Sequence, residues 1–313
     1  MLAAVLPSAA TPAHDTRTSQ PGRIGLIAYA RTYVPEVANA GSYGGFDAIW
    51  LVNAGGSHRH RVLSAGGGKS TVSEPAWSPD GTKLAYTRFT GRTFELHIAT
   101  GGGRPIRTVA TGLDSYFGFR PTWSPRGDEI AVADGQAIQI FSTTTSARRT
   151  VPTPPGEVTD ADWSSTERFV FSLRDPDSAV NIWTMNADST GAAQLTSTPP
   201  AKNAPIQYLR PSWSPAGRRI LFMRFDVPAR ILVMNADGTG VRQLARGDDP
   251  AWSPDGTRIV YDSGFASTIS TIVVKPVAGG KAKVLASSQR QDGSDHVWQP
   301  DWQPCPRGRC ARG

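Results

Sequence analysis

The segment Pro75–Gly81 reads P-A-W-S-P-D-G and marks a place where the chain turns sharply. Pro79 presets φ for the first corner of a type I β-turn, and Gly81 accepts the left-handed conformation that ends such a turn. The run Leu84–Tyr86 that follows is short, apolar and β-prone, as expected for a strand. The segment therefore predicts a tight turn between two antiparallel strands, the first of which ends at Trp77.

The same unit recurs along the chain, and each copy is anchored on a tryptophan. Successive tryptophans are separated by 46, 40, 50, 39 and 50 residues, and the six are Trp77, Trp123, Trp163, Trp213, Trp252 and Trp302. A period of about 40 to 50 residues is typical of propeller blades. The repeated tryptophans therefore have a structural explanation, which is packing between neighbouring blades.

The residues between the tryptophans predict three further strands in each unit. A second strand follows the turn, a third strand such as 182–185 or 231–234 comes next, and turn residues then precede a fourth. Four antiparallel strands make a blade. The chain begins with a copy of the second strand at 27–29 and ends with a copy of the first at Trp302. We therefore predict an all-β, six-bladed β-propeller whose last blade is closed by the N- and C-terminal strands, which removes two exposed sheet edges.

These repeats resemble the propeller repeats of the TolB family. The resemblance rests on the W-S-P-D-G turns and on M-N-A-D-G-T-G at 234–240, and it covers residues 24–304. It is weakest after Trp163, where Ser165–Glu167 replaces the Pro-x-Gly of other turns. It implies a shared architecture and partner binding at the mouth of the ring. True TolB proteins also carry an α/β domain before the propeller, and roughly twenty residues cannot encode one, so we expect a TolB-like propeller without that domain.

Both ends of the chain lie outside the repeats. Residues 1–21 begin with an apolar stretch and then small residues, like the second half of a signal peptide, which predicts export; a disordered tail is the alternative. The propeller is expected at 22–304 and a C-terminal tail at 305–313. Cys305 and Cys310 are predicted to form a disulfide loop suited to a secreted, periplasmic or cell-surface protein, and two free thiols are the alternative. No run reaches the roughly 18 apolar residues of a membrane span.

The charge of the chain is moderately basic, with 33 basic and 26 acidic residues and a formal net charge of +7. Arginine pairs such as Arg148/Arg149 and Arg218/Arg219 are scattered over different repeats, whereas a nucleic-acid-binding protein usually concentrates its charge on one element or stripe. We therefore expect no nucleic-acid partner. The expected partner is a protein or another cell-envelope component, bound by a monomer.

Function is expected where the repeats differ. The loops before the tryptophan strands approach one end of the channel, so residues two to seven places before each tryptophan should converge at that mouth. Aromatic anchors and a few charges in a concave site suit a peptide, a protein loop or a glycan, with ordinary loop packing as the alternative. The candidate partner-binding residues are Glu74, Asp114, Tyr116, Phe117, Phe119, Arg120, Asp160, Tyr208, Arg210, Asp248, Asp249, Asp295, His296 and Trp298.

Sequence patterns of catalysis and metal binding are not found. Asn235–Gly240 resembles half of a calcium loop but lacks the repeated acidic positions and the terminal glutamate of that motif. The five histidines suggest no metal triad, and neither H-E-x-x-H nor G-x-S-x-G occurs. We therefore expect no catalytic residue, no metal and no cofactor.

Three functions are compatible with these observations. The leading hypothesis is an exported binding or scaffold propeller that recognises a protein or cell-envelope component at the channel mouth. The second is a metal-dependent polysaccharide lyase or hydrolase, whose candidate groups are Asp248, Asp249, Asp295, His296 and either His58 or His60. The third is an accessory propeller that gates a separate hydrolase.

Overall fold

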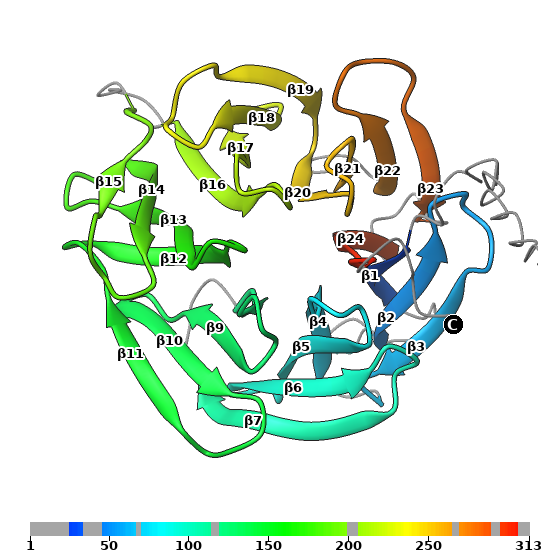
Figure 1. Cartoon of the computed structure of the whole chain (residues 1–313). Coiled ribbons are helices and arrows are strands. Elements are labelled where there is room, and N and C mark those ends of the chain that lie inside the picture. The colour runs from blue at the N-terminus through cyan, green and yellow to red at the C-terminus, as the bar shows by residue number, and fades with distance from the viewer. Residues whose placement is uncertain are drawn as a thin grey trace, which may run out of the picture.

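The chain forms a ring of β-sheets around a central channel, and Figure 1 views this ring along its axis. The structure is a computed structural model that describes residues 25–33, 46–66, 70–113, 119–198, 206–264, 269–288 and 295–305. All regular elements within these ranges are strands, β1 to β24. In the described part of the chain, no helix has the length and apolarity needed to cross a membrane. The predicted all-β propeller is confirmed.

Four of the five hydrogen-bonded sheets have four antiparallel strands each. The sheet that contains both chain ends has the order β24 (Asp295–Trp302), β1 (Leu26–Tyr33), β2 (Phe46–Asn53) and β3 (His60–Ser64). The next follows chain order through β4 (Thr71–Trp77), β5 (Lys83–Phe89), β6 (Phe94–Thr100) and β7 (Pro105–Leu113). The third has β8 (Thr122–Trp123), β9 (Glu129–Ala133), β10 (Ala137–Ser142) and β11 (Arg148–Pro152). The fourth has β20 (Asp248–Trp252), β21 (Arg258–Asp262), β22 (Thr271–Pro276) and β23 (Lys283–Ser287).

The fifth sheet has eight strands and consists of two antiparallel runs. The first run is β12 (Glu157–Trp163), β13 (Arg168–Arg174), β14 (Val180–Asn186) and β15 (Ala193–Gln194). The second is β16 (Gln207–Trp213), β17 (Arg219–Phe225), β18 (Arg230–Asn235) and β19 (Arg242–Arg246). One parallel bridge, between Val180 and Gln207, joins β14 to β16. The number of blades depends on how this bridge is counted, so six blades remain a prediction.

The two chain ends meet in one sheet, as the repeat order predicted. Strands β1 and β24 pair antiparallel over a register that runs from Ile27 opposite Trp302 to Tyr33 opposite Asp295. The guanidinium of Arg31 on β1 also donates to both carboxylate oxygens of Asp295, at 2.9 and 2.7 Å. The ring is therefore closed by backbone pairing and by a partly buried ion pair.

The hydrophobic core is divided into clusters that lie between neighbouring sheets or, in the eight-stranded sheet, between its two runs. Each of six clusters contains one repeat tryptophan, and these side chains are only 3 to 7% exposed. In one cluster Trp77 and Val72 of β4 pack against Ile49 and Leu51 of β2. In another, Trp302 of β24 packs with Val260 of β21. Because each of these tryptophans is buried between two neighbouring sets of strands, the tryptophans hold the ring together.

Removing the indole of Trp302 should destabilise the whole ring. We expect Trp302→Ala to lower the free energy of unfolding by about 3 to 5 kcal/mol, because the side chain is buried at the closing strand. Trp298→Ala is the matched control on the same strand, where the side chain is 37% exposed, and it should cost about 1 kcal/mol or less. Urea unfolding followed by tryptophan fluorescence measures both, and equal losses would contradict closure by this strand.

Candidate functional site

The channel is crossed by a layer of six polar residues, one from each repeat, located three residues before each tryptophan. We call this set the polar layer: Glu74, Arg120, Asp160, Arg210, Asp249 and Gln299. Four of its members have left-handed backbones, with φ of 50° at Glu74, 54° at Arg210, 43° at Asp249 and 51° at Gln299. The pairing register shifts at the same places, as in the step between Ser73 and Ala76. Such bulges redirect a side chain away from the alternating pattern of a strand.

Arg210 is the centre of the polar layer. Its guanidinium lies 2.9 Å from Glu74 Oε1, 3.1 Å from Asp249 Oδ1 and 3.5 Å from Asp160 Oδ1. The side-chain amide of Gln299 donates to the same Glu74 oxygen at 2.6 Å. Burial by itself would lower the pKa of Arg210, but the carboxylates of Asp249, Glu74 and Asp160 raise it well above its ordinary value. The guanidinium therefore stays charged, and its positive charge offsets the negative charge of the three carboxylates around it.

A second set of side chains lies one residue before the tryptophans and joins neighbouring repeats. Asp301 Oδ2 accepts the backbone N–H of Trp77 at 2.7 Å, and Asp162 Oδ2 accepts that of Trp213 at 2.7 Å. Burial raises the pKa of Asp301 to about 6 and also raises that of Asp162. These two buried carboxyl groups therefore connect neighbouring repeats rather than serve as free acids.

A cavity of about 440 Å³ extends from the polar layer to the tight turns after the tryptophans. Its inner end includes Glu74, Arg120, Asp249 and Gln299. Arg120 is close enough to influence the pKa values of Glu74, Asp162 and Asp301. The walls and rim of the cavity are formed by the tryptophans and turn prolines of the repeat: Trp77, Trp123, Trp163, Trp213, Trp252, Trp302, Pro79, Pro125, Pro215, Pro254 and Pro304.

The structure brings part of the predicted site together. Glu74, Arg120, Asp160, Arg210 and Asp249 all belong to the polar layer, as described above. They lie inside the channel, and Glu74, Arg120 and Asp249 form the inner end of a cavity that opens toward the turns. The sequence interpretation placed the mouth at the opposite end, near the loops before the tryptophan strands. The predicted and observed positions differ because most of these residues lie within the inner strands, and bulges in those strands turn the side chains into the channel.

Other predicted residues lie away from the cavity. Phe119 is 1% exposed and packs edge-on against Phe94, with ring centroids 5.6 Å apart, and Tyr208 packs in the same manner on Phe222 at 5.7 Å. Asp295 is buried against Arg31, as described for the closing strands. These contacts favour packing over ligand contact for the three residues.

Two further candidates lie on β24, and three others lie outside the described residues. His296 and Trp298 lie on β24, opposite Thr32 and Ala30 of β1. Asp114, Tyr116 and Phe117 lie outside the described residues, and so does Cys310, so the disulfide with Cys305 stays a prediction. Among the described residues, no group of three His, Cys, Asp or Glu side chains is placed to hold a metal ion.

Sequence reasoning missed Gln299, Asp301 and the tryptophans as residues of the channel. A signal for them was present, because five repeats read polar residue, Pro, x, Trp: E-P-A-W, R-P-T-W, R-P-S-W, D-P-A-W and Q-P-D-W, with D-A-D-W as the sixth. A polar residue at a constant position in every repeat points to a common location around the axis. The tryptophans have two roles: they pack between sheets, and they line the cavity.

A pair of carboxyl groups faces each other beside the polar layer. Asp248 on β20 is the register partner of Asp262 on β21. Burial, followed by the negative charge of Asp249, raises the pKa of Asp248 to about 7. Burial likewise raises the pKa of Asp262 well above its ordinary value, and the charges of Asp249 and Asp248 add to the effect. At least one of the two carboxyl groups therefore holds a proton in mildly acidic solution.

Replacing the central arginine should leave three buried carboxylates without a cation. We expect Arg210→Met to lower the free energy of unfolding by about 3 to 5 kcal/mol. The control is Arg126→Met, which removes an arginine that is 70% exposed and contacts Asp128 and Glu167, and which should cost about 1 kcal/mol or less. Chemical denaturation of both variants measures the difference, and similar losses would show that the polar layer is not stabilised by Arg210.

Stability should fall as the pH rises from about 4 to about 7. In this window the folded chain keeps protons on carboxyl groups such as Asp248 and Asp301, whose raised pKa values are about 7 and about 6, while the unfolded chain releases them. Asp248→Asn should make the fall shallower, because it removes one titrating group. Asp237→Asn should leave it unchanged, because the pKa of this exposed carboxylate is lowered and it titrates below the window. Unfolding curves at a series of pH values test this, and a rise in stability would refute it.

Comparison with known proteins supports this architecture. No family profile matches the chain. It is 24% identical over 301 residues to the Tol-Pal system protein TolB of Francisella tularensis subsp. mediasiatica, and the match covers 90% of this chain and 65% of that protein. It is also 24% identical over 206 residues to an uncharacterised protein of Agrobacterium fabrum, covering 59% of this chain and 67% of that one. The chain thus spans less than two thirds of the length of the TolB relatives that it matches.

Solved structures agree in fold. TolB from Acinetobacter baumannii superposes with a TM-score of 0.71 at 18% identity, over 91% of this chain and 68% of that chain. A putative TolB from Agrobacterium tumefaciens gives 0.59 at 19% identity, over 89% and 99%. A chain of a nidogen/laminin complex gives 0.62 at 11% identity, over 89% and 100%, which shows that the fold is shared beyond TolB proteins. The chain is therefore a TolB-like β-propeller, similar to TolB proteins in sequence and in fold.

Proposed function

We propose that this chain is an exported binding or scaffold propeller that recognises a protein or another cell-envelope component at one end of its channel. The observation that carries the proposal is the cavity of about 440 Å³, which has aromatic and proline walls and a polar floor. Concave sites of this composition provide apolar contact area together with a few orienting polar groups. The TolB relatives are named as proteins of the Tol-Pal system, which supports a role in an assembly.

The proposal includes a ring of six blades formed by one domain, residues 22–304. Each of the two runs in the eight-stranded sheet has four strands and its own repeat tryptophan, Trp163 or Trp213. One bridge, from Val180 to Gln207, connects them. Six hydrophobic clusters, each with one tryptophan, also fit six interfaces between blades.

A binding role fits the polar groups of the channel better than catalysis does. Asp249 is held by Arg210, and Asp295 is held by Arg31. His58 lies between β2 and β3, at the end of the ring opposite to the start of β20 and β24. Two of the carboxylates that a metal-dependent lyase or hydrolase would need are thus held by arginines, and His58 lies at the other end of the ring. We therefore propose a non-enzymatic protein.

Narrowing the rim of the cavity should abolish capture of the partner. Ser165 and Pro215 line the cavity and are exposed, and Ser165 Oγ donates to the carbonyl of Pro215. We expect Ser165→Tyr/Pro215→Tyr to reduce capture from a cell-envelope extract at least tenfold, because the added rings obstruct the entrance.

The matched control introduces the same two side chains at the other end of the ring, as Asp177→Tyr/Val227→Tyr, where both residues are exposed. It should capture as the unmodified chain does. Quantitative mass spectrometry of the eluates compares the three proteins, after urea unfolding has shown similar stability. Equal capture by both double variants would remove the cavity as the binding site.

A further inference from the structure

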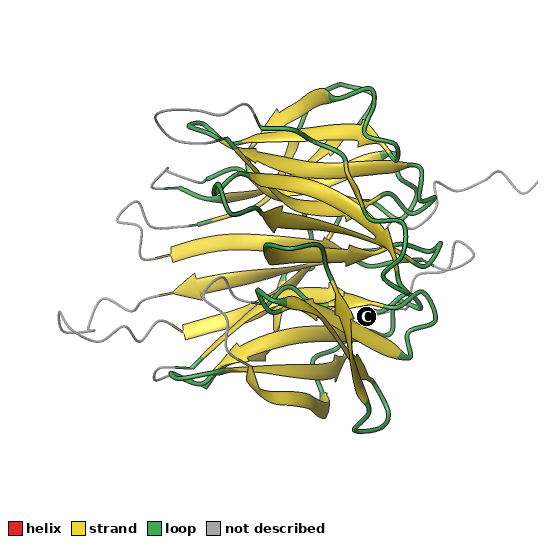
Figure 2. Cartoon of the chain, turned by 90° about the vertical axis from the view of Figure 1, so that its left-hand side faces the viewer, coloured by secondary structure: helices red, strands yellow, loops and turns green. Residues whose placement is uncertain are grey.

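The two faces of the ring are built from different connections. In each sheet the turn after the first strand and the turn after the third lie at the same end, as the backbone bonds from Gly101 N–H to Thr82 O and from Ala236 N–H to Arg218 O show. Figure 2 shows the ring edge-on, with strands running from one face to the other. We call the end formed by these turns the turn face: residues 53–61, 78–83, 100–107, 124–129, 142–149, 164–168, 186–193, 214–219, 235–242, 253–258, 275–283 and 303–305. The opposite end is the loop face.

Charge is distributed unequally between the two faces. The turn face carries sixteen Lys and Arg residues and seven Asp and Glu residues. The described hairpins of the loop face, at 89–94, 133–137, 174–180 and 225–230, carry three basic and four acidic residues. Among these described segments, the excess of basic over acidic residues therefore lies on the turn face.

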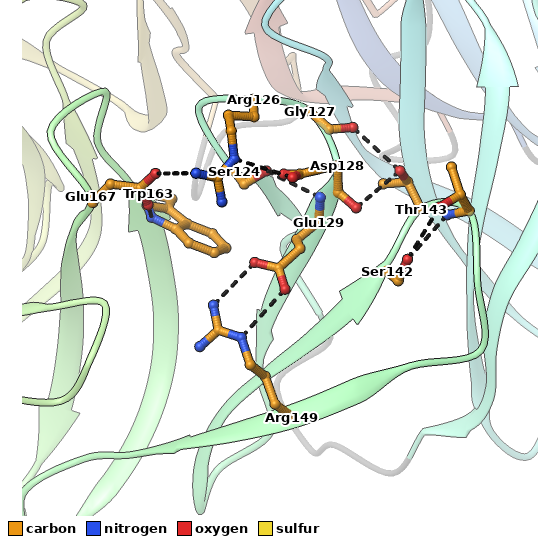
Figure 3. Close-up of polar contacts among 11 residues, drawn as sticks. Ser124, Arg126, Gly127, Asp128, Glu129, Ser142, Thr143, Arg149, Trp163 and Glu167 are labelled. Atoms are coloured by element: carbon orange, nitrogen blue, oxygen red, sulfur yellow. Dashed lines mark hydrogen bonds and ion pairs between the residues drawn. The ribbon is translucent and has the colours of Figure 1, made fainter.

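The acidic residues of the turn face are engaged locally. Asp80 accepts from Ser78 and Thr82, and Asp237 accepts from the backbone and the hydroxyl of Thr239. Figure 3 shows the same face around β9, where Arg126 contacts Asp128 and Glu167 and where Arg149 forms a two-point contact with Glu129. These carboxylates are committed to the turns and to neighbouring arginines.

Half of the basic residues of the turn face are exposed and form no ion pair within the described ranges. They come from all five sheets and lie on the same face as the rim of the cavity: Arg59, Arg61, Arg104, Arg148, Arg218, Arg242, Lys281 and Lys283. Exposed aliphatic side chains stand among them. Ile106, Val241 and Val284 are 50%, 53% and 54% exposed, and each lies within two residues of one of these cations.

We infer that the turn face docks on the surface of an anionic lipid bilayer. The cations are spread around a broad face instead of lining one groove, so they match an extended anionic plane better than a compact ligand. Exposed Ile106, Val241 and Val284 can enter the headgroup region, where apolar side chains beside basic ones favour binding. Docking of this kind goes beyond the proposed function, because it needs no occupant in the cavity. It would position the cavity toward the membrane.

Vesicle binding tests this inference directly. The full chain should bind vesicles of phosphatidylglycerol and phosphatidylcholine in flotation assays, and it should not bind vesicles of phosphatidylcholine alone. Arg104→Gln/Arg218→Gln should weaken binding about 25-fold, since a cation near an anionic surface contributes about 1 kcal/mol, which is about fivefold in affinity. Moving from low to half-molar NaCl should also weaken binding strongly, because salt screens exposed charges.

The matched control removes two exposed arginines outside the turn face, as Arg92→Gln/Arg246→Gln, and keeps the same net charge as the test variant. It should bind the mixed vesicles within twofold of the unmodified chain. Equal weakening by both double variants would overturn docking by the turn face, and so would equal binding to both kinds of vesicle. Binding to soluble polyglutamate but not to vesicles would assign the cations to an acidic polymer instead of a bilayer. Loss of partner capture by the cavity variants, with vesicle binding retained, would separate this inference from the proposed function.

Discussion

The antiparallel pairing of β1 with β24 is the contact on which the other features of the ring depend. It joins residues more than 260 positions apart, for example Arg31 and Asp295, and it covers the edge of β1 that would otherwise be unpaired. Only a closed ring can place a repeat tryptophan at every interface between neighbouring sheets. Closure also brings the inner strands of all repeats around one axis, which creates both the polar layer and the cavity.

Because the inner strands converge on one axis, charged side chains are buried there. Glu74, Asp160 and Asp249 are each placed in the channel by a bulge in their strand, and a buried charge is costly unless it is paired. Arg210 contacts all three, and Gln299 supplies a further hydrogen bond to Glu74. One guanidinium with five donors can satisfy several carboxylates at once, which a lysine cannot do with the same geometry. The polar layer thus forms a rigid floor for the cavity.

The repeat also gives the two faces of the ring different surfaces. Aspartates at turn positions such as Asp80 and Asp255 are needed locally, because their carboxylates accept hydrogen bonds that shape the turn. Arginines and lysines beside them have no such role, and many extend into solvent. Along the sequence these cations are scattered, a pattern that argues against one basic stripe for nucleic acid. In the folded ring the same residues are gathered on one face, since the turns of all sheets lie at the same end.

Local chemistry was enough to predict the strands, the turns, the repeat and the pairing of the chain ends. Each depends on residues close in sequence, such as Pro79 and Gly81 in a turn, or on counting copies of one unit. The number of sheets was less certain, because the bridge from Val180 to Gln207 merges two runs. The candidate site was predicted only in part: Arg210 and Glu74 were named, but neither their contact nor the position of the cavity could be derived. Those two residues are 136 positions apart, and only ring closure and bulged strands bring their side chains together.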